Sequence, residues 1–474
     1  MSGITKQVKT KPSQKYDRLS GFSSLGMNSH ILAGIIATGM GIVFLAVSLL
    51  FASEVIVAAL VLMAIAVVVI LKWPVVGLIG FVIISFIRPA DIMPSLAAIP
   101  LAKLIGGGTF LAVLLKHIRS KDILFQYKQT YLLATLTIIL FVSVPLSYWP
   151  SRSLEISMDF TKILIFFLIF INIVRDLKTL RVVSLVAVAC MCILCYSTIQ
   201  SYLDGSLRAA ATIGAGLYGD SNDVALMLVT SIPLVGFVKF NQKRMITANF
   251  LYWGIVLFLS AGVIVTESRG GLLGLIAVLM LTFMRGRNKL KGILILLIVG
   301  LLAIPFLPAE ISERYKTIGE YGDDPSAMNR LYAWQAGLDM MISRPLYGVG
   351  IGAFETAFGT AYKPDGFNSA RWMAPHNTLV QIGAETGIVG LFIFLYLYIF
   401  CMLQLKRIRI RQTGINYQRL AQTRDIIFTG FVGFAICAFF LTQALNYILY
   451  FLIASTVCLH NINSFRNQTT DTNK

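Results

Sequence analysis

The sequence predicts an all-α fold: a polytopic membrane helix bundle of about 12–14 transmembrane helices, with one long periplasmic loop that contains an amphipathic helix. Of the 474 residues, 57% are hydrophobic and only 13% are charged, about half the charged fraction of a soluble domain. The mean hydropathy is +0.78. This apolar content exceeds what one or two soluble cores bury, which excludes a soluble globular or disordered chain.

The third observation is a series of apolar runs long enough to cross about 30 Å of hydrocarbon. They lie at 31–51, 55–71, 98–115, 129–147, 157–174, 182–199, 222–240, 248–266, 270–284, 292–307, 376–403, 425–442 and 446–461. A shorter run at 74–87 lies in a proline-rich stretch. Between residues 55 and 115, a re-entrant pair or a broken helix is therefore an alternative to further spans.

The distribution of Lys and Arg predicts the orientation. Alternate connections and the two tails hold about 28 of the 40 basic residues, and such segments face the cytoplasm. The net charge of +18 is then a topology signal, and nucleic acid is not an expected partner. The predicted parts are a cytoplasmic basic tail (1–30), an N-terminal transmembrane bundle (31–307), a periplasmic loop (308–375), C-terminal transmembrane helices (376–461) and a cytoplasmic tail (462–474).

Apart from His376, the cysteines and histidines are not candidates for catalysis or metal binding. The six cysteines fall within or at the ends of apolar runs, so we expect small buried hydrophobic side chains rather than a disulfide framework or a metal cluster. His30, His117 and His460 fall at predicted cytoplasmic span ends or loops and are expected to be solvated.

The loop contains one predicted helix. Asp324 is a candidate cap before Pro325, and Arg344 followed by Pro345 ends the pattern. Its apolar residues at helical spacing are Met328, Leu331, Trp334, Leu338, Met341 and Ile342. We expect this face to lie on the bundle or on the membrane surface. The glycine-rich stretch 348–352 is interpreted as a flexible return toward the membrane, because its spacing fits no nucleotide-binding loop.

Four polar clusters lie at the predicted outer face, which is more than solvation alone explains. They are Gly219–Asp223, Glu267–Gly271, the pair Asn329 and Arg330, and Pro375–Asn377.

His376 is the strongest candidate for chemistry. It lies at a predicted helix start, where the positive end of the helix dipole favours a neutral imidazole that can accept a proton. Asn377, Gln381 and Glu385 continue a polar stripe at four-residue spacing. An ionisable residue at the depth of Glu385 is a functional candidate. The alternative is that His376 is an interfacial helix-end residue and that Glu385 accepts from an internal donor.

Two arginines are candidates for binding phosphate. Arg269 lies in a short turn beside two glycines, and guanidinium suits bidentate contact with a pyrophosphate. Arg330 shares a predicted helix face with Trp334 and Gly337. The alternatives are lipid-headgroup anchoring for Arg269 and a solvated helix charge for Arg330.

A divalent ion held by acidic residues of the loop is a weaker possibility, and we predict neither a metal site nor a cofactor. The residues concerned are Glu320, Asp323 and Asp324.

The stretches Arg330–Trp334, Ser343–Gly350, Pro375–Asn377 and Glu385–Leu391 together resemble the O-antigen ligase/polymerase superfamily. Asp220–Asn222 and Glu267–Gly271 are similar to two earlier motifs of that family. The resemblance covers about residues 219–391.

The resemblance implies a metal-independent, inverting glycosyltransferase of the bacterial inner membrane that uses undecaprenyl-pyrophosphate-linked glycans at the periplasmic face. His376 would be the general base, Arg269 and Arg330 would hold the pyrophosphate, and Asn222, Asn377 and Glu385 complete the predicted substrate site. The acceptor would be a glycan, lipid or protein hydroxyl, and the expected partners are membrane lipid and a chain-length regulator.

Within the family, the residues that make up the motifs favour a polymerase of O-antigen or exopolysaccharide repeat units. An O-antigen or protein O-glycan ligase is the alternative. A transporter for lipid-linked sugars or a small anion is the rival from another class, although the sequence shows no internal repeat of the kind transporters carry.

Overall fold

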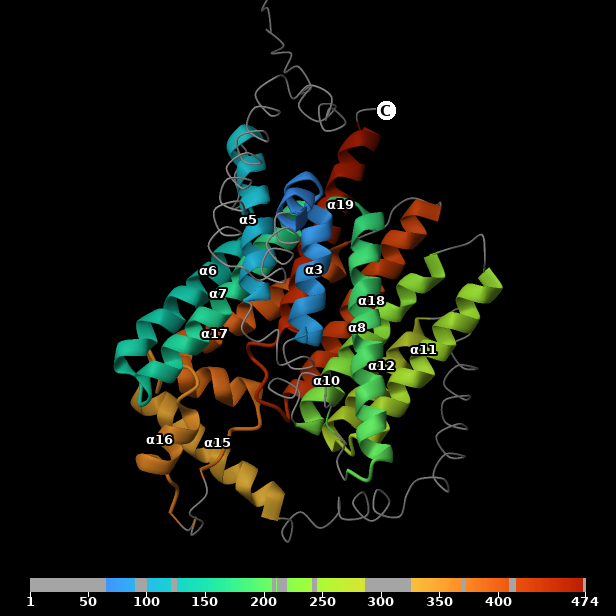
Figure 1. Cartoon of the computed structure of the whole chain (residues 1–474). Coiled ribbons are helices and arrows are strands. Elements are labelled where there is room, and N and C mark those ends of the chain that lie inside the picture. Colours follow the sequence, from blue (N-terminus) through green and yellow to red (C-terminus); the bar gives the residue numbers. More distant parts are fainter. Residues whose placement is uncertain are drawn as a thin grey trace, which may run out of the picture. The chain divides into compact units, whose positions relative to one another are not determined.

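The computed structural model describes residues 65–89, 100–120, 126–206, 210, 220–240, 245–285, 325–365, 367, 372–408 and 415–471. From residue 70 onward they belong to one compact unit. The helices of this unit are α3 (Pro74–Ile87), α5 (Leu101–Ser120), α6 (Lys128–Ser143), α7 (Pro150–Ile173), α8 (Leu177–Leu203), α10 (Ser221–Ser231), α11 (Met245–Val265), α12 (Arg269–Met284), α15 (Pro325–Ser343), α16 (Phe354–Thr360), α17 (Thr378–Arg407), α18 (Ile415–Ala438) and α19 (Tyr447–Asp471), with 3-10 segments η4 (Val144–Leu146) and η5 (Ile232–Phe240) (Figure 1).

The predicted all-α membrane bundle is confirmed. Among the described residues there is no strand, and eight helices are long and apolar enough to span a membrane. A ninth span results if the helix at 65–72 and α3, which are bent by 116° at Trp73, count as one. That bend matches the predicted alternative of a re-entrant pair or broken helix. The predicted tail 1–30 and the predicted spans 31–51 and 292–307 lie outside the described residues.

Polar side chains cap the starts of α8 and α12. The carboxylate of Asp176 accepts the backbone N–H of Thr179 at 2.9 Å at the start of α8. The hydroxyl of Ser268 accepts the backbone N–H of Gly271 at 3.1 Å at the start of α12. Each cap satisfies one of the N–H groups that a helix N-terminus leaves without an internal partner.

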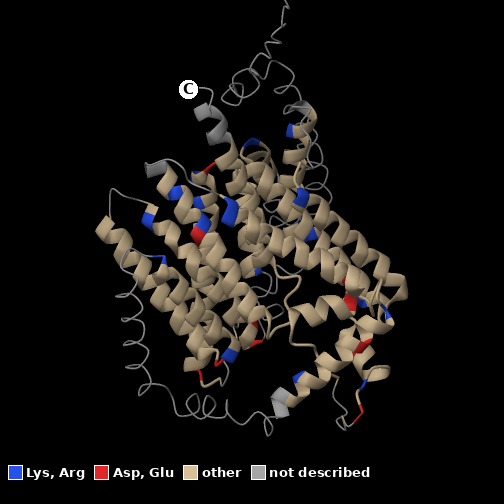
Figure 2. Cartoon of the chain, turned by 180° about the vertical axis from the view of Figure 1, so that it is seen from behind, with Lys and Arg blue, Asp and Glu red and all other residues tan. Residues whose placement is uncertain are grey.

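The helix ends gather at two opposite ends of the unit. At one end, Gln129 at the start of α6 donates to Gln404 near the end of α17 at 2.6 Å, and Arg419 near the start of α18 donates to the carbonyl of Phe240 at 3.0 Å. Lys and Arg concentrate there (Figure 2), so we name it the basic end. The opposite end, where α17 begins and α15 packs, is the loop end.

A break in α17 attaches the loop to the bundle. Gly387 has φ 74° and ψ −179°, which interrupts the helix. The N–H of Ile388 donates instead to the carbonyl of Pro345 at 2.8 Å, and the freed carbonyl of Ala384 accepts the N–H of Val349 at 2.9 Å. Loop backbone therefore supplies the hydrogen bonds that the broken helix lacks.

The expectation that 348–352 is a flexible return was wrong. Gly348, Gly350 and Gly352 have φ of 64°, 97° and 72°, a region that favours glycine. The carbonyl of Val349 also accepts the N–H of Tyr148 at 3.0 Å. The glycines let this segment run tightly between α17 and the start of α7, where it is held by hydrogen bonds.

The loop helix exists where it was predicted, as α15, but only part of its predicted apolar face packs on the protein. The buried residues are Ala333, Ala336, Met340 and Met341. The predicted apolar residues Leu331, Leu338 and Ile342 are 48%, 54% and 75% exposed. Two of these four buried residues are alanines, whose small side chains permit a close approach to α17. The alternative, that the exposed stripe lies on the membrane surface, stays a prediction.

Two side-chain expectations have outcomes in the described residues. All six cysteines are free and all except the half-buried Cys192 are buried, which confirms their packing role. The expectation that His117 is solvated was wrong: it is 7% exposed, and its Nδ1 lies 2.9 Å from the carbonyl of Val113 in the preceding turn.

Replacing Gly387 by Ala is expected to destabilise the protein. An added Cβ would lie 2.4 Å from the carbonyl oxygen of Pro345, and left-handed backbone costs a non-glycine residue roughly 1–2 kcal/mol before any clash. The measurement is the thermal unfolding midpoint in detergent. Gly254→Ala in α11 is the control, because its Cβ would meet nothing within 4 Å. Equal midpoints for the two variants would contradict this account of the break.

Candidate active site

A short connection between α18 and α19, residues 439–446, is the centre of the loop-end polar network. The side-chain amide of Gln443 donates to Asp223 Oδ1 of α10 at 2.6 Å. Its backbone N–H donates to Thr378 Oγ1 of α17 at 3.1 Å, and the Thr378 hydroxyl donates to the carbonyl of Leu441 at 2.7 Å. The 439–446 connection therefore joins the starts of α10 and α17.

The predicted polar stripe on α17 continues this network inward. Gln381 accepts the N–H of Ala444 at 3.2 Å, and its amide donates to Glu385 Oε2 at 3.4 Å. The Glu385 carboxylate, 3% exposed, also accepts from the backbone of Gly352 and Phe354. Glu385 thus has internal donors, as its alternative interpretation expected, and ties the glycine segment to α17.

The backbone around His376 is unusual. His376 has φ 42°, a left-handed conformation that is uncommon outside glycine and that clusters at functional sites. On one side of it, the carbonyl of Pro375 accepts the indole N–H of Trp334 at 2.9 Å. On the other, Asn377 caps α17, and its side-chain oxygen accepts two backbone N–H groups at 2.9 and 3.1 Å. The half-buried imidazole is therefore held between two anchored neighbours.

Arg330 lies on the face of α15 that approaches the start of α17. Trp334, one turn later, packs edge-on against Phe439 with ring centroids 5.6 Å apart. Gly337, a further turn along, lies so close to Val380 that an added Cβ would be 2.3 Å from its methyl group. Because residues three and four apart share a helix face, Arg330 is directed along the same side as Trp334.

Arg269 occupies the first position of α12, where glycines allow close packing. A Cβ on Gly270 would lie 3.1 Å from the ring of Phe440, and one on Gly271 would lie 2.5 Å from Ala225 of α10. The turn that carries the half-buried Arg269 is thus pressed between the 439–446 connection and α10.

Asn222 is held at the start of α10. Its backbone N–H and its side-chain amide both donate to Asp220 Oδ1, at 2.8 and 2.9 Å. Its neighbour Asp223 binds Gln443, so Asn222 also lies next to the 439–446 connection.

The structure gathers the predicted residues around one feature that sequence reasoning missed. Asn222 and Arg269 are each next to a residue that lies against the 439–446 connection. His376 is two residues before Thr378, which is hydrogen-bonded to the connection. Arg330 is one turn from Trp334, which packs on Phe439 of the connection. The missed residue is Gln443. Its signal was the polar stretch Thr442–Asn446 between two apolar runs, which separates the predicted spans at 425–442 and 446–461.

Two guanidinium groups, one imidazole and several amides at the end of a membrane bundle suit an anionic substrate with a reacting hydroxyl. Among the described residues no group of three or more His, Cys, Asp or Glu side chains could hold a metal ion. Glu320, Asp323 and Asp324, the residues considered for one, lie outside the described part of the chain.

Comparison with known proteins finds a family similar to the region that contains most of the candidate site. A family model described as O-antigen ligase matches residues 254–395, which contain Arg269, Arg330, His376 and Glu385. This part of the chain is therefore similar to the O-antigen ligase family. Asn222 and Gln443 lie outside the matched region.

Curated relatives point the same way. Over 199 residues the chain is 26% identical to a predicted polysaccharide ligase of Rickettsia conorii, covering 40% of this chain and 47% of that protein. Over 270 residues it is 28% identical to one of Rickettsia prowazekii, covering 53% and 62%. The matches therefore span about half to three fifths of these relatives.

Replacing Gln443 by Glu is expected to destabilise the folded protein by about 1–3 kcal/mol, because it removes the donor to Asp223 and faces one carboxylate with another. The measurement is the free energy of unfolding in detergent. Gln422→Glu on the exposed side of α18 is the matched control and should change stability by no more than about 0.5 kcal/mol. Equal effects at the two positions would show that the network contributes nothing.

Proposed function

We propose that this chain is a membrane glycosyltransferase of the O-antigen ligase type. It transfers a glycan from undecaprenyl pyrophosphate to an acceptor hydroxyl at the periplasmic face of the bacterial inner membrane. The observation that carries the proposal is the position of His376, in left-handed backbone between two anchored residues, within the matched region that also contains Arg269 and Arg330. The N- and C-termini are cytoplasmic, as the basic end supports (Figure 2).

The proposed reaction is a single displacement. The acceptor oxygen attacks the anomeric carbon, the bond from that carbon to the pyrophosphate oxygen breaks, and its electron pair leaves with the pyrophosphate. Attack opposite the leaving group inverts the anomeric configuration. His376 takes the hydroxyl proton, and Arg269 and Arg330 donate hydrogen bonds to the departing phosphates. Because guanidinium groups neutralise that charge, no metal ion is required, so activity should persist in chelator.

The other predicted site residues take different parts. Asn222, next to the 439–446 connection, is proposed to contact substrate. Asn377 and Glu385 are proposed as positioning residues, because one caps α17 before His376 and the other binds the glycine segment. A transporter is less well supported, since the break in α17 is filled by loop backbone rather than lining a pathway.

The comparisons favour a ligase over the polymerase that the motif residues suggested, because the matched relatives are predicted ligases. A polymerase would use the same donor chemistry with another glycan as acceptor. A deletion strain separates the two. If the chain is a ligase, long lipid-linked chains should accumulate, as seen by gel analysis of extracted glycans. Loss of all long chains would instead identify a polymerase.

His376→Ala should reduce glycan transfer by about 10²–10⁴-fold at normal protein level, because general-base catalysis typically contributes that much. The measurement is transfer from lipid-linked donor by the purified variant. His460→Ala, the same substitution near the other end of the bundle, should keep activity. A stably folded His376→Ala variant with near wild-type transfer would remove the base assignment.

The same assay reports on the arginines. Lys at position 269 or 330 should be a poor substitute, because an ammonium loses the bidentate geometry of guanidinium. Normal transfer by both Lys variants would leave these arginines as anchors only.

The orientation is tested with single cysteines in a chain lacking the six native ones. Thr360→Cys, exposed at the loop end, should react with a membrane-impermeant maleimide in intact spheroplasts. Lys178→Cys, exposed at the basic end, should react only after lysis. The reverse pattern would place His376 in the cytoplasm and contradict a periplasmic donor.

A further inference from the structure

A second polar site lies at the basic end, far from the candidate active site along the helices. It is a pocket of about 300 Å³ between the ends of α12 and α17 and the first half of α18. Its walls are Arg285, Leu405, Lys406, Arg424, Asp425 and Phe428.

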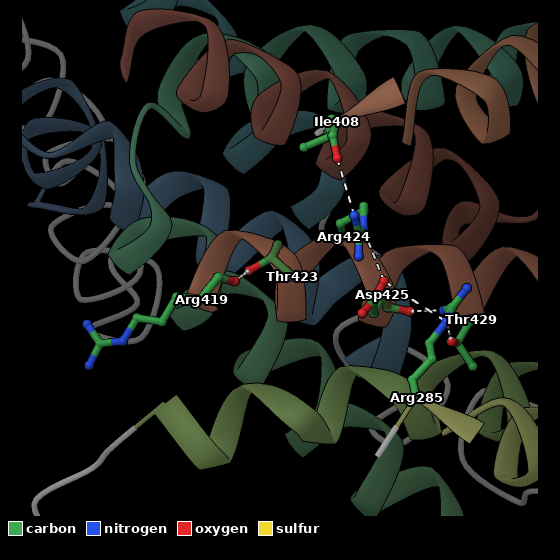
Figure 3. Close-up of polar contacts among 7 residues, drawn as sticks. All are labelled: Arg285, Ile408, Arg419, Thr423, Arg424, Asp425 and Thr429. Atoms are coloured by element: carbon green, nitrogen blue, oxygen red, sulfur yellow. Dashed lines mark hydrogen bonds and ion pairs between the residues drawn. The ribbon is translucent and has the colours of Figure 1, made fainter. Parts of the chain in front are cut away.

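Two guanidinium groups are fixed in this pocket. Arg285, the residue after α12, donates to Thr429 Oγ1 at 2.8 Å and to the carbonyl of Asp425 at 3.0 Å. Arg424 donates to Asp425 Oδ1 at 3.0 Å and to the carbonyl of Ile408 at 3.2 Å. Figure 3 shows the two side chains meeting at Asp425 from different helices. Both arginine side chains are only 29% exposed.

The charges in the pocket do not balance. Asp425 is the single carboxylate in the wall, and its oxygen lies 3.0 Å from Arg424 and 4.0 Å from Arg285. Lys406 adds a third cation, with its ammonium 5.8 Å from the centre of the Phe428 ring. The described wall therefore carries two positive charges in excess.

The partly buried, apolar surroundings strengthen the binding of an anion in this pocket. The Arg285 guanidinium lies over Phe428, 4.5 Å from the ring centre, and Leu405 is fully buried. Burial lowers the pKa of Arg285, which the charge of Asp425 opposes. Like-charged groups held together in partly buried surroundings gain from an added anion with several acceptor oxygens. Phosphate has that form, and guanidinium binds it with two parallel hydrogen bonds.

We infer that this pocket binds a phosphate group between Arg285, Arg424 and Lys406, at the end of the bundle opposite His376. Two sources carry this chemistry: the headgroup of an anionic phospholipid and a soluble phosphate. The pocket lies at the ends of membrane-spanning helices, at headgroup level, and one wall is apolar, which favours the lipid. The inference does not rest on the proposed glycosyl transfer.

The test measures binding to the purified, delipidated full chain in neutral detergent. Native mass spectrometry follows short-chain phosphatidylglycerol and phosphatidylcholine, and thermal unfolding follows inorganic phosphate. Lys406→Gln removes an exposed charge without breaking a hydrogen bond that holds the fold, and Arg285→Gln removes a fixed one. Lys178→Gln, also exposed at the basic end but outside the pocket, is the matched control.

We expect each pocket variant to weaken phosphatidylglycerol binding about tenfold or more, with Lys178→Gln unchanged and phosphatidylcholine weak throughout. If the pocket variants weaken only the binding of inorganic phosphate, the site is supported and its ligand is a soluble phosphate. Equal affinities in Lys406→Gln, Arg285→Gln and Lys178→Gln, or no binding of either anion by the wild-type chain, would overturn the inference.

Discussion

A backbone carbonyl in an apolar bundle must find a hydrogen-bond donor, and the loop end of this protein depends on how that requirement is met at Gly387. The break in α17 leaves Ala384 without its helical partner, and Val349 of the loop supplies the N–H. The loop is thereby joined to the helix by backbone hydrogen bonds, whatever side chains surround them. The position of α15 over the start of α17 follows from this attachment.

The polar network of the site is built on that frame. Glu385 lies just before the break and holds the glycine segment through the N–H groups of Gly352 and Phe354. Gln381 is hydrogen-bonded to Ala444 of the 439–446 connection, and Gln443 of that connection is hydrogen-bonded to Asp223 of α10. Buried polar groups of this kind are costly unless every member is paired, and paired they orient their neighbours closely. The network thereby helps to fix the positions of His376 and Arg269, although its own members need not contact the substrate.

The two ends of the bundle use arginine in contrasting ways. At the loop end, Arg269 and Arg330 come from separate helices that meet at the 439–446 connection. At the basic end, Arg285 and Arg424 share one carboxylate, Asp425, and are tied to carbonyl and hydroxyl oxygens. A shared carboxylate fixes two guanidinium groups near each other without cancelling their charge. Lysine could not replace either arginine there, since an ammonium lacks the planar set of donors.

The sequence by itself determined the class of the fold, most of the spans and the identity of the candidate catalytic residues. Those features depend on local properties: apolar run length, basic connections, Pro325 at a helix start, and polar residues such as His376 at the end of a run. Only the tertiary structure decided which face of α15 is buried, that the glycine segment is held, and that Gln443 connects α10 to α17. These outcomes depend on pairs of residues far apart in the chain, such as Val349 with Ala384 and Asp223 with Gln443. Local pattern carries no information about such pairs, because a hydrogen bond or a close contact across helices needs the geometry of both partners.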